Sequence, residues 1–382
     1  MSGCALLKRG GPGGERPGRI MPVMALATTL LAVPSGAVSA AGPFSDQLAA
    51  PSGINGLFIH TSGSGDTVDY APNIGGGEHA PAERRQRYTE TGAGIVWSPL
   101  APLELSLSFA RRHLNGMRDA YELDAWSGEL RTRLTPEDSR THAHLAIGLA
   151  TNKSDRLVKN SWTRINGARL TEVSLQDARD RTLHADLTTT TPLTRNITAS
   201  GLIGIGRVAV EHAALTGSGS DARGCEYDFS FTGTSGLLKQ PRPCGNILAF
   251  EQTYASEAAI DDRFGLAPSK DIAWQGDYWR IGAGASLAQG RFDANVGVRW
   301  RYWQENDLMA AIRERGNGPI TISRTAWLGM GWRLSPSLRI GAAAVWRSAP
   351  LLNEAPVLYN ALSVNRYHGE AMTFTLGVQL SL

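Results

Sequence analysis

The last eleven residues of the chain, 372–382, alternate between apolar side chains and small or polar ones. The apolar positions are Phe374, Leu376, Val378, Leu380 and Leu382, and the residues between them are threonine, glycine, glutamine and serine. Since successive side chains of a strand point to opposite faces, this segment predicts a strand with one apolar face and one polar face.

The first forty residues have the parts of a secretory signal peptide. A basic leader comes first, at Lys8, Arg9, Arg16 and Arg19. An apolar stretch of thirteen residues follows at 21–33, and small residues precede Ala41 as a cleavage site. A membrane helix needs roughly 20 apolar residues, so the stretch is too short for one. We predict that residues 1–40 are a signal peptide that is removed, and that residues 41–52 form a periplasmic N-terminal segment.

The charge balance argues against a nucleic-acid partner. The chain has 38 basic and 35 acidic residues, of which the first forty residues hold four and one, so 34 of each kind remain. The mature chain is then formally neutral, and it has no run rich in lysine or arginine. We therefore expect no nucleic-acid partner.

Two cysteines, Cys225 and Cys244, remain after the leader with Cys4 is removed. They bracket eighteen residues rich in glycine, serine, proline and threonine, so a disulfide that closes one surface loop is the natural prediction for an exported chain. A metal pair is the alternative, but no histidine or second cysteine pair lies nearby. We expect no metal and no cofactor.

Alternating segments recur along the chain as hairpins with short turns. The clearest pairs are 83–98 with 103–110, 183–188 with 197–205, 279–287 with 292–302, and 326–332 with 338–346. Each turn carries proline, glycine, asparagine or serine, which accept tight-turn dihedrals. Further strands near 53–61, 121–134, 142–150 and the C-terminus bring the predicted count to twelve.

The connections between the hairpins are long and polar. They lie at about 62–82, 153–177, 211–250, 304–319 and 348–366. Short turns at one end and long loops at the other are typical of a barrel that spans an outer membrane.

Aromatic residues favour the same fold. Trp97 and Trp332 adjoin short turns, whereas Trp300, Tyr302 and Trp346 lie at the far ends of their strands. This predicts two aromatic belts at the two membrane interfaces. A soluble sandwich with buried tryptophans is the alternative, but charges would then occupy the other face freely, and that face is mostly glycine, serine, threonine and alanine.

The leader, the Pro/Ser turns and the final strand at 374–382 together resemble the Gram-negative outer-membrane β-barrel class. The resemblance covers residues 53–382 and implies an all-β, transmembrane, antiparallel up-and-down barrel of about 12 strands, with short periplasmic turns and long extracellular loops. It also implies outer-membrane lipids, lipopolysaccharide and the barrel-assembly machinery as partners. The chain departs from the class at Leu382, where members commonly end on an aromatic residue.

Six arginines lie at those alternate positions of the C-terminal strands that are predicted to face inward: Arg280, Arg299, Arg301, Arg333, Arg339 and Arg347. In a narrow lumen they would attract anions and repel cations. The alternative is that they pair with acidic residues such as Glu104, Asp186 or Asp293 and brace the barrel. Both interpretations stay open from the sequence.

A weaker polar cluster comprises His142, His144, His184 and Asp186, which all lie at strand positions predicted to face inward. Catalysis would need a nucleophile within about 3 Å of an oriented base, and serines are common in any polar lumen. Two histidines on one strand are an incomplete metal site.

The sequence favours an outer-membrane channel or facilitated transporter for small solutes, with anion preference through the luminal arginines. An outer-membrane enzyme that acts on lipid or lipopolysaccharide is one alternative, and a structural, adhesive or secretion-related barrel is another. We expect no enzyme activity and no catalytic residues. The strand count does not decide, because eight strands are usually filled and sixteen usually open.

Overall fold

The computed structural model describes most of the chain after residue 55. The described residues are 56–64, 86–100, 102–116, 119–160, 163–165, 167–363 and 370–381. The predicted signal peptide at 1–40, the segment 41–52 and Leu382 lie outside them. No helix among the described residues is long and apolar enough to cross a membrane.

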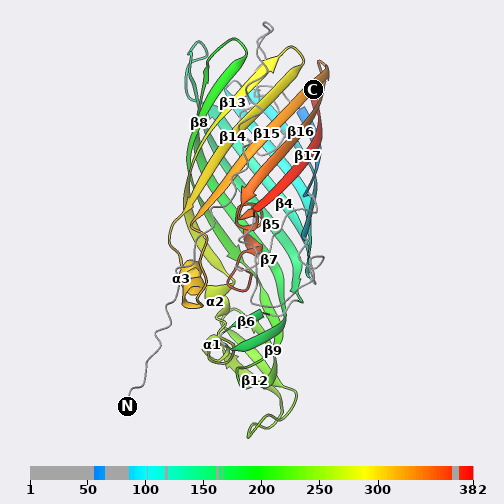
Figure 1. Cartoon of the computed structure of the whole chain (residues 1–382), viewed down its shortest axis with the longest axis vertical. Helices are drawn as coiled ribbons and strands as arrows, with labels where there is room; N and C mark the ends of the chain where they lie inside the picture. The colour runs from blue at the N-terminus through cyan, green and yellow to red at the C-terminus, as the bar shows by residue number, and fades with distance from the viewer. Residues whose placement is uncertain are drawn as a thin grey trace, which may run out of the picture. The chain divides into compact units, whose positions relative to one another are not determined.

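Twelve of the described strands close into one antiparallel barrel (Figure 1). In ring order they are β1 (Gly56–Ser64), β2 (Gln86–Leu100), β3 (Leu103–Gly116), β4 (Asp119–Arg133), β5 (His142–Lys159), β7 (Ala168–Pro192), β8 (Ile197–Glu211), β13 (Trp274–Gln289), β14 (Phe292–Trp303), β15 (Ile322–Ser335), β16 (Leu338–Ser348) and β17 (Glu370–Ser381). Strand β17 pairs back with β1, with Gly56 opposite Ser381 and Ser64 opposite Thr373. The predicted barrel architecture and strand count are confirmed.

The apolar side chains of the strands face outward. In β17, the apolar residues from Met372 to Leu380 are exposed, while Thr373, Thr375 and Gln379 are buried inside the barrel. The same alternation runs through β13, where Ile281 is exposed and its neighbour Arg280 is buried. A sandwich core would bury these apolar side chains against each other, so this orientation excludes that alternative.

The outward apolar surface forms a band with aromatic residues near both edges. Trp97 and Trp332 are exposed beside short turns, and the rings of Trp279 and Tyr302 stack 4.0 Å apart near the other edge. Beyond this second edge, charged pairs appear on the outer face, such as Arg207 with Asp277. About ten residues of each tilted strand separate this edge from the short turns. The apolar band is therefore about 25 Å high, as in membrane barrels.

At the long-loop end, part of the chain builds a second set of strands, which we call the distal sheet. Its strands are β9 (Ala214–Ser220), β10 (Glu226–Thr232), β11 (Ser235–Gln240) and β12 (Phe250–Ser256), with the short β6 (Thr163–Ile165) beside β7. Strand β7 has 25 residues, and its first part pairs with β9. The predicted loops at 153–177 and 211–250 are therefore largely strand.

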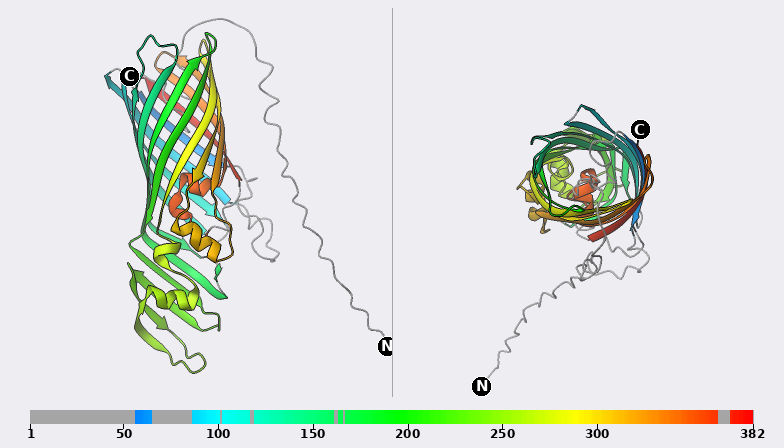
Figure 2. Two further views of the ribbon diagram at one scale, coloured as in Figure 1. Left: turned by 90° about the vertical axis from the view of Figure 1, so that its left-hand side faces the viewer. Right: turned by 90° about the horizontal axis from the view of Figure 1, so that it is seen from above.

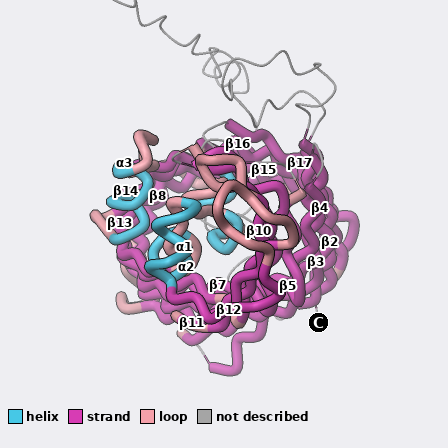
Figure 3. The backbone as a smooth tube through the Cα atoms, turned by 90° about the horizontal axis from the view of Figure 1, so that it is seen from below, coloured by secondary structure: helices cyan, strands magenta, loops and turns pink. Residues whose placement is uncertain are grey.

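Three helices lie at the same end of the barrel (Figure 3). They are α1 (Glu257–Phe264), α2 (Pro268–Asp271) and α3 (Asp307–Glu314). Ser256 caps α1 by accepting from the Ala259 amide, and Gly265 ends it with a φ of 65°. Apolar residues of α1 and α3, such as Phe264 and Ile312, share one hydrophobic core with aromatic residues of β10.

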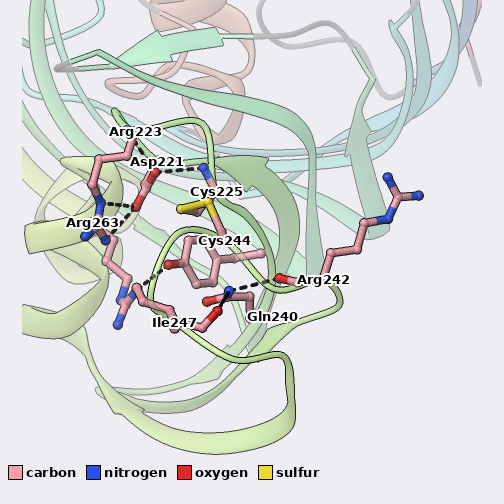
Figure 4. The surroundings of a disulfide bond; sticks show 9 residues. Asp221, Arg223, Cys225, Gln240, Arg242, Cys244, Ile247 and Arg263 are labelled. Atoms are coloured by element: carbon pink, nitrogen blue, oxygen red, sulfur yellow. Dashed lines mark hydrogen bonds and ion pairs between the residues drawn. A yellow bond between two sulfur atoms is a disulfide. The ribbon is translucent and has the colours of Figure 1, made fainter.

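The predicted disulfide between Cys225 and Cys244 is present in the distal sheet (Figure 4). The carboxylate of Asp221 accepts from the backbone amides of Arg223 and Cys225 at 2.9 and 3.0 Å. Cys225 is buried in the hydrophobic core. The bridge therefore joins the start of β10 to the segment between β11 and β12.

We expect Val296→Arg to destabilise the barrel, because Val296 lies on the outward face within the apolar band. A charged residue near the bilayer midplane costs about 2–4 kcal/mol. Gln275→Arg is the matched control, because Gln275 is exposed on β13 beyond the band. The measurement is the free energy of unfolding in lipid vesicles. Equal losses for the two variants would contradict the assigned position of the membrane.

We expect replacement of both Cys225 and Cys244 by serine to loosen the distal sheet and leave the barrel intact. Closing a loop of this length contributes about 3 kcal/mol in the chain-entropy model. The measurement is limited proteolysis: cleavage between β10 and β12 should accelerate, while the barrel strands stay resistant. Unchanged cleavage would show that the core under the sheet holds this segment without the bridge.

Candidate functional site

The connection from β16 to β17 turns into the barrel (Figure 2). It contains α4 (Pro350–Glu354) and the 3-10 helix η3 (Pro356–Leu358), and we call residues 349–363 the inner loop. Most of its side chains are buried, including Leu351, Leu352 and Val357. The prediction of a polar loop at about 348–366 was therefore wrong for this part. Its apolar residues pack into the core of the long-loop end.

Hydrogen bonds fasten the inner loop to the wall across the lumen from its origin. The carbonyl oxygen of Glu354 accepts from Arg112 Nη1 at 2.5 Å and from Asn152 Nδ2 at 3.0 Å. The amide of Val357 donates to Asp180 Oδ2 at 2.9 Å. In the ring of twelve strands, β5 with Asn152 stands six places from β16, where the loop begins. The inner loop therefore crosses the lumen.

The far part of the inner loop is held by Tyr359. Its carbonyl oxygen accepts from Trp274 Nε1 at 2.9 Å, and its hydroxyl accepts from the amide of Ile320 at 3.1 Å. Burial raises the pKa of Tyr359 to about 12, so the hydroxyl stays neutral at neutral pH. Strand β13, with Trp274, thus gives the loop a further attachment to the wall.

A chamber of about 190 Å³ lies in the lumen next to the inner loop, and Asn353, Glu354 and Pro356 of the loop form part of its lining. The ionisable lining residues include Glu90, Arg112, His184, Arg280, Arg301, Arg347 and Glu354. Serine and threonine residues from several strands supply most of the remaining polar surface. Four arginines against two glutamates give the lining an excess of positive charge.

Glycines on β8 make room for the side chains of this wall. A Cβ atom on Gly206 would lie 2.3 Å from Cζ of Tyr278, and one on Gly204 would overlap the carboxylate of Asp186. The guanidinium carbon of Arg301 lies 4.4 Å from the centre of the Tyr278 ring, a cation–π contact. The glycines therefore let the Tyr278 ring lie against the wall and support Arg301 at the chamber.

The six predicted arginines all lie on luminal positions of β13 to β16, but their surroundings differ. Arg280 stands opposite Arg301 in the register, and Arg299 stands opposite Gly282. Arg280 Nε donates to Asp186 Oδ1 at 2.7 Å. Arg280, Arg301 and Arg347 line the chamber.

The other arginines lie away from the chamber lining. Arg339 Nε donates to Asp293 Oδ2 at 3.0 Å, and Arg333 is opposite Arg339 near the short turns. Arg299 is buried in the wall. Arg280 and Arg339 thus pair with the predicted acidic partners Asp186 and Asp293, and the prediction of an anion path stays a prediction.

The predicted histidine cluster is spread over two strands. His142 and His144 stand opposite Thr190 and Thr188 of β7. His184 Nε2 lies 3.5 Å from Glu129 Oε2, and Asp186 is engaged by Arg280. Among the described residues, no group of three or more histidine, cysteine, aspartate or glutamate residues has the arrangement of a metal site.

Sequence reasoning missed the polar network that links the inner loop to β2 and β3. Glu90 Oε2 accepts from Arg112 Nε at 2.6 Å and from the Tyr88 hydroxyl at 2.7 Å. His60 Nε2 lies 3.0 Å from Glu90 Oε1. A partial signal existed: Glu90 lies in the predicted strand 83–98, Arg112 lies two residues beyond the predicted strand 103–110, and both continue the inward-facing alternation of that hairpin. Only the structure reveals that Glu354 joins them.

Comparison with known proteins finds solved barrel structures of low sequence identity and low TM-score. No family model matches the chain, and no curated protein matches it in sequence. Among solved structures, the translocator domain of autotransporter NalP from Neisseria meningitidis is 9% identical with a TM-score of 0.43, over 86% of this chain and 88% of that one. The NanC porin is 8% identical with a TM-score of 0.39, over 85% and 100%. LpxR from Salmonella typhimurium is also 8% identical, with a TM-score of 0.36 over 85% and 100%.

We expect Gly206→Ala to destabilise the barrel by about 1–3 kcal/mol, the usual cost of overpacking, because the new methyl group collides with Tyr278. Gly63→Ala is the control, since a Cβ there meets only the Tyr88 carbonyl oxygen at an ordinary 3.6 Å. Denaturant unfolding of the two variants in detergent or lipid tests this. Equal stability would show that Tyr278 moves aside at no cost.

Proposed function

We propose that this protein is an outer-membrane channel or facilitated transporter for small solutes, and that the inner loop closes it in the present conformation. The observation that carries the proposal is the polar chamber inside a closed barrel whose apolar face points outward. A barrel that served only as an anchor needs no such chamber. A translocation route needs a polar interior of this kind.

The outer membrane is the bilayer that fits this chain. Closed barrels satisfy every backbone hydrogen bond across lipid, and the predicted signal peptide would deliver the chain for insertion. In this arrangement the short turns face the periplasm, the distal sheet lies at the cell surface, and the inner loop lies inside the lumen. The disulfide Cys225–Cys244 suits that oxidising location.

An anion preference is the finer part of the proposal. The chamber lining holds Arg112, Arg280, Arg301 and Arg347 against Glu90 and Glu354, and Asp186 neutralises part of this charge from beside Arg280. Inside a low-dielectric barrel, a remaining positive excess favours anions over cations.

The distal sheet favours a second candidate, a binding or adhesive module at the cell surface. It is a folded, disulfide-linked structure beyond the barrel, and it shares its core with the helices. An enzyme has less support, because the contacts of His184 and Asp186 are with Glu129 and Arg280, which gives no pair of nucleophile and base.

Single-channel recording in planar bilayers tests the proposal. We expect openings that become more frequent in Asp180→Ala, which removes the acceptor for the Val357 amide of the inner loop. In a KCl gradient the reversal potential should indicate chloride preference, and Arg301→Gln should reduce it. Arg324→Gln, at an outward position on β15, should leave it unchanged. A folded Asp180→Ala protein without conductance would exclude the channel, and a cation preference insensitive to Arg301→Gln would exclude the anion path.

A further inference from the structure

The carboxylate of Glu354 lies between two guanidinium groups of the barrel wall. Its Oε1 is 2.7 Å from Arg347 Nε, and its Oε2 is 3.5 Å from Arg112 Nη2. Arg347 belongs to β16 and Arg112 to β3. Both side chains are largely buried, and all three residues line the chamber.

The two arginines are positioned by the wall as well as by the loop. Arg112 Nε donates to Glu90 at 2.6 Å, and Arg347 Nη1 donates to Thr373 Oγ1 at 2.9 Å. These partners belong to β2 and β17, so they stay in place when the inner loop moves. The fork formed by the two guanidinium groups is therefore a preformed carboxylate site, and Glu354 supplies the carboxylate in this conformation.

We propose that Arg112 and Arg347 bind the carboxylate group of a small solute, and that Glu354 is a tethered substitute which the solute displaces. This inference rests on the proposed function and names its substrate class. The solute binds the arginines only when Glu354 has left them, so it stabilises conformations with a displaced inner loop. A carboxylate solute thereby promotes its own passage.

The displacement costs little free energy because it exchanges one carboxylate for another. A solute carboxylate takes over the two ion pairs that Glu354 gives up, so the guanidinium groups of the fork exchange one carboxylate partner for another. The ion pair of Arg207 with Asp277 is a contrasting case, because both side chains are on the outer face of the barrel and do not line the chamber.

The test uses acetate as the probe and the full-length mature protein in lipid vesicles. Leu352→Cys places one free thiol at a buried position of α4, because Cys225 and Cys244 are joined to each other. The labelling rate with a charged maleimide then reports movement of the inner loop, whether or not ions pass. The rate is compared in potassium acetate and in potassium chloride of equal ionic strength.

We expect acetate to raise the labelling rate about tenfold once it reaches about ten times its dissociation constant. Adding Glu354→Gln should raise the rate in chloride and abolish the difference between the two salts. Asp277→Asn, which removes a carboxylate from the outer face, should behave as the parent protein does. Heat-modifiable gel migration confirms that each variant is folded.

Equal rates in acetate and chloride in the Leu352→Cys protein would overturn the inference, and this comparison does not depend on the folding of Glu354→Gln. A full acetate effect that persists in Glu354→Gln would also overturn it. Acetate-dependent labelling without conductance would exclude the channel and keep the carboxylate site. Conductance without acetate-dependent labelling would exclude the site alone.

Discussion

The pairing of β17 with β1 closes the sheet into a ring, and no strand edge is left open among the described strands of the barrel. In lipid, each backbone amide and carbonyl group needs a partner within the protein, and only a closed ring provides one for every strand. The register that joins Gly56 to Ser381 fixes which side chains face outward and which face the lumen. The apolar band, the luminal arginines and the chamber all follow from that parity.

On the luminal face of this ring, several large or charged side chains lie against glycines of the neighbouring strand. Gly206 faces Tyr278, Gly204 faces Asp186, and the same relation joins Gly297 to Trp327. Large side chains can therefore lie along the wall, which leaves space for the chamber. The inner loop crosses the lumen differently: its side chains are mostly apolar, and Glu354 and the Val357 amide attach it to charged residues of the wall.

The barrel could be predicted from the sequence because period-two alternation is local, whereas the inner loop could not. Strand parity placed Arg280 and Arg301 on the luminal face correctly, and the cysteine count predicted the Cys225–Cys244 bridge. The path of residues 349–363 depends on contacts with Asn152 and Asp180, about two hundred residues earlier in the sequence. No local pattern encodes such a contact, although the apolar residues of the loop were a visible sign that it is buried.

The inner loop crosses the lumen and is held on the far wall. Amide hydrogen exchange at Val357 in lipid tests it most directly, because this amide donates to Asp180 inside the barrel. We expect protection comparable to that of the barrel strands, and we expect it to be lost when Asp180 is replaced by alanine. Exchange at the rate of an unstructured chain in the unaltered protein would contradict it.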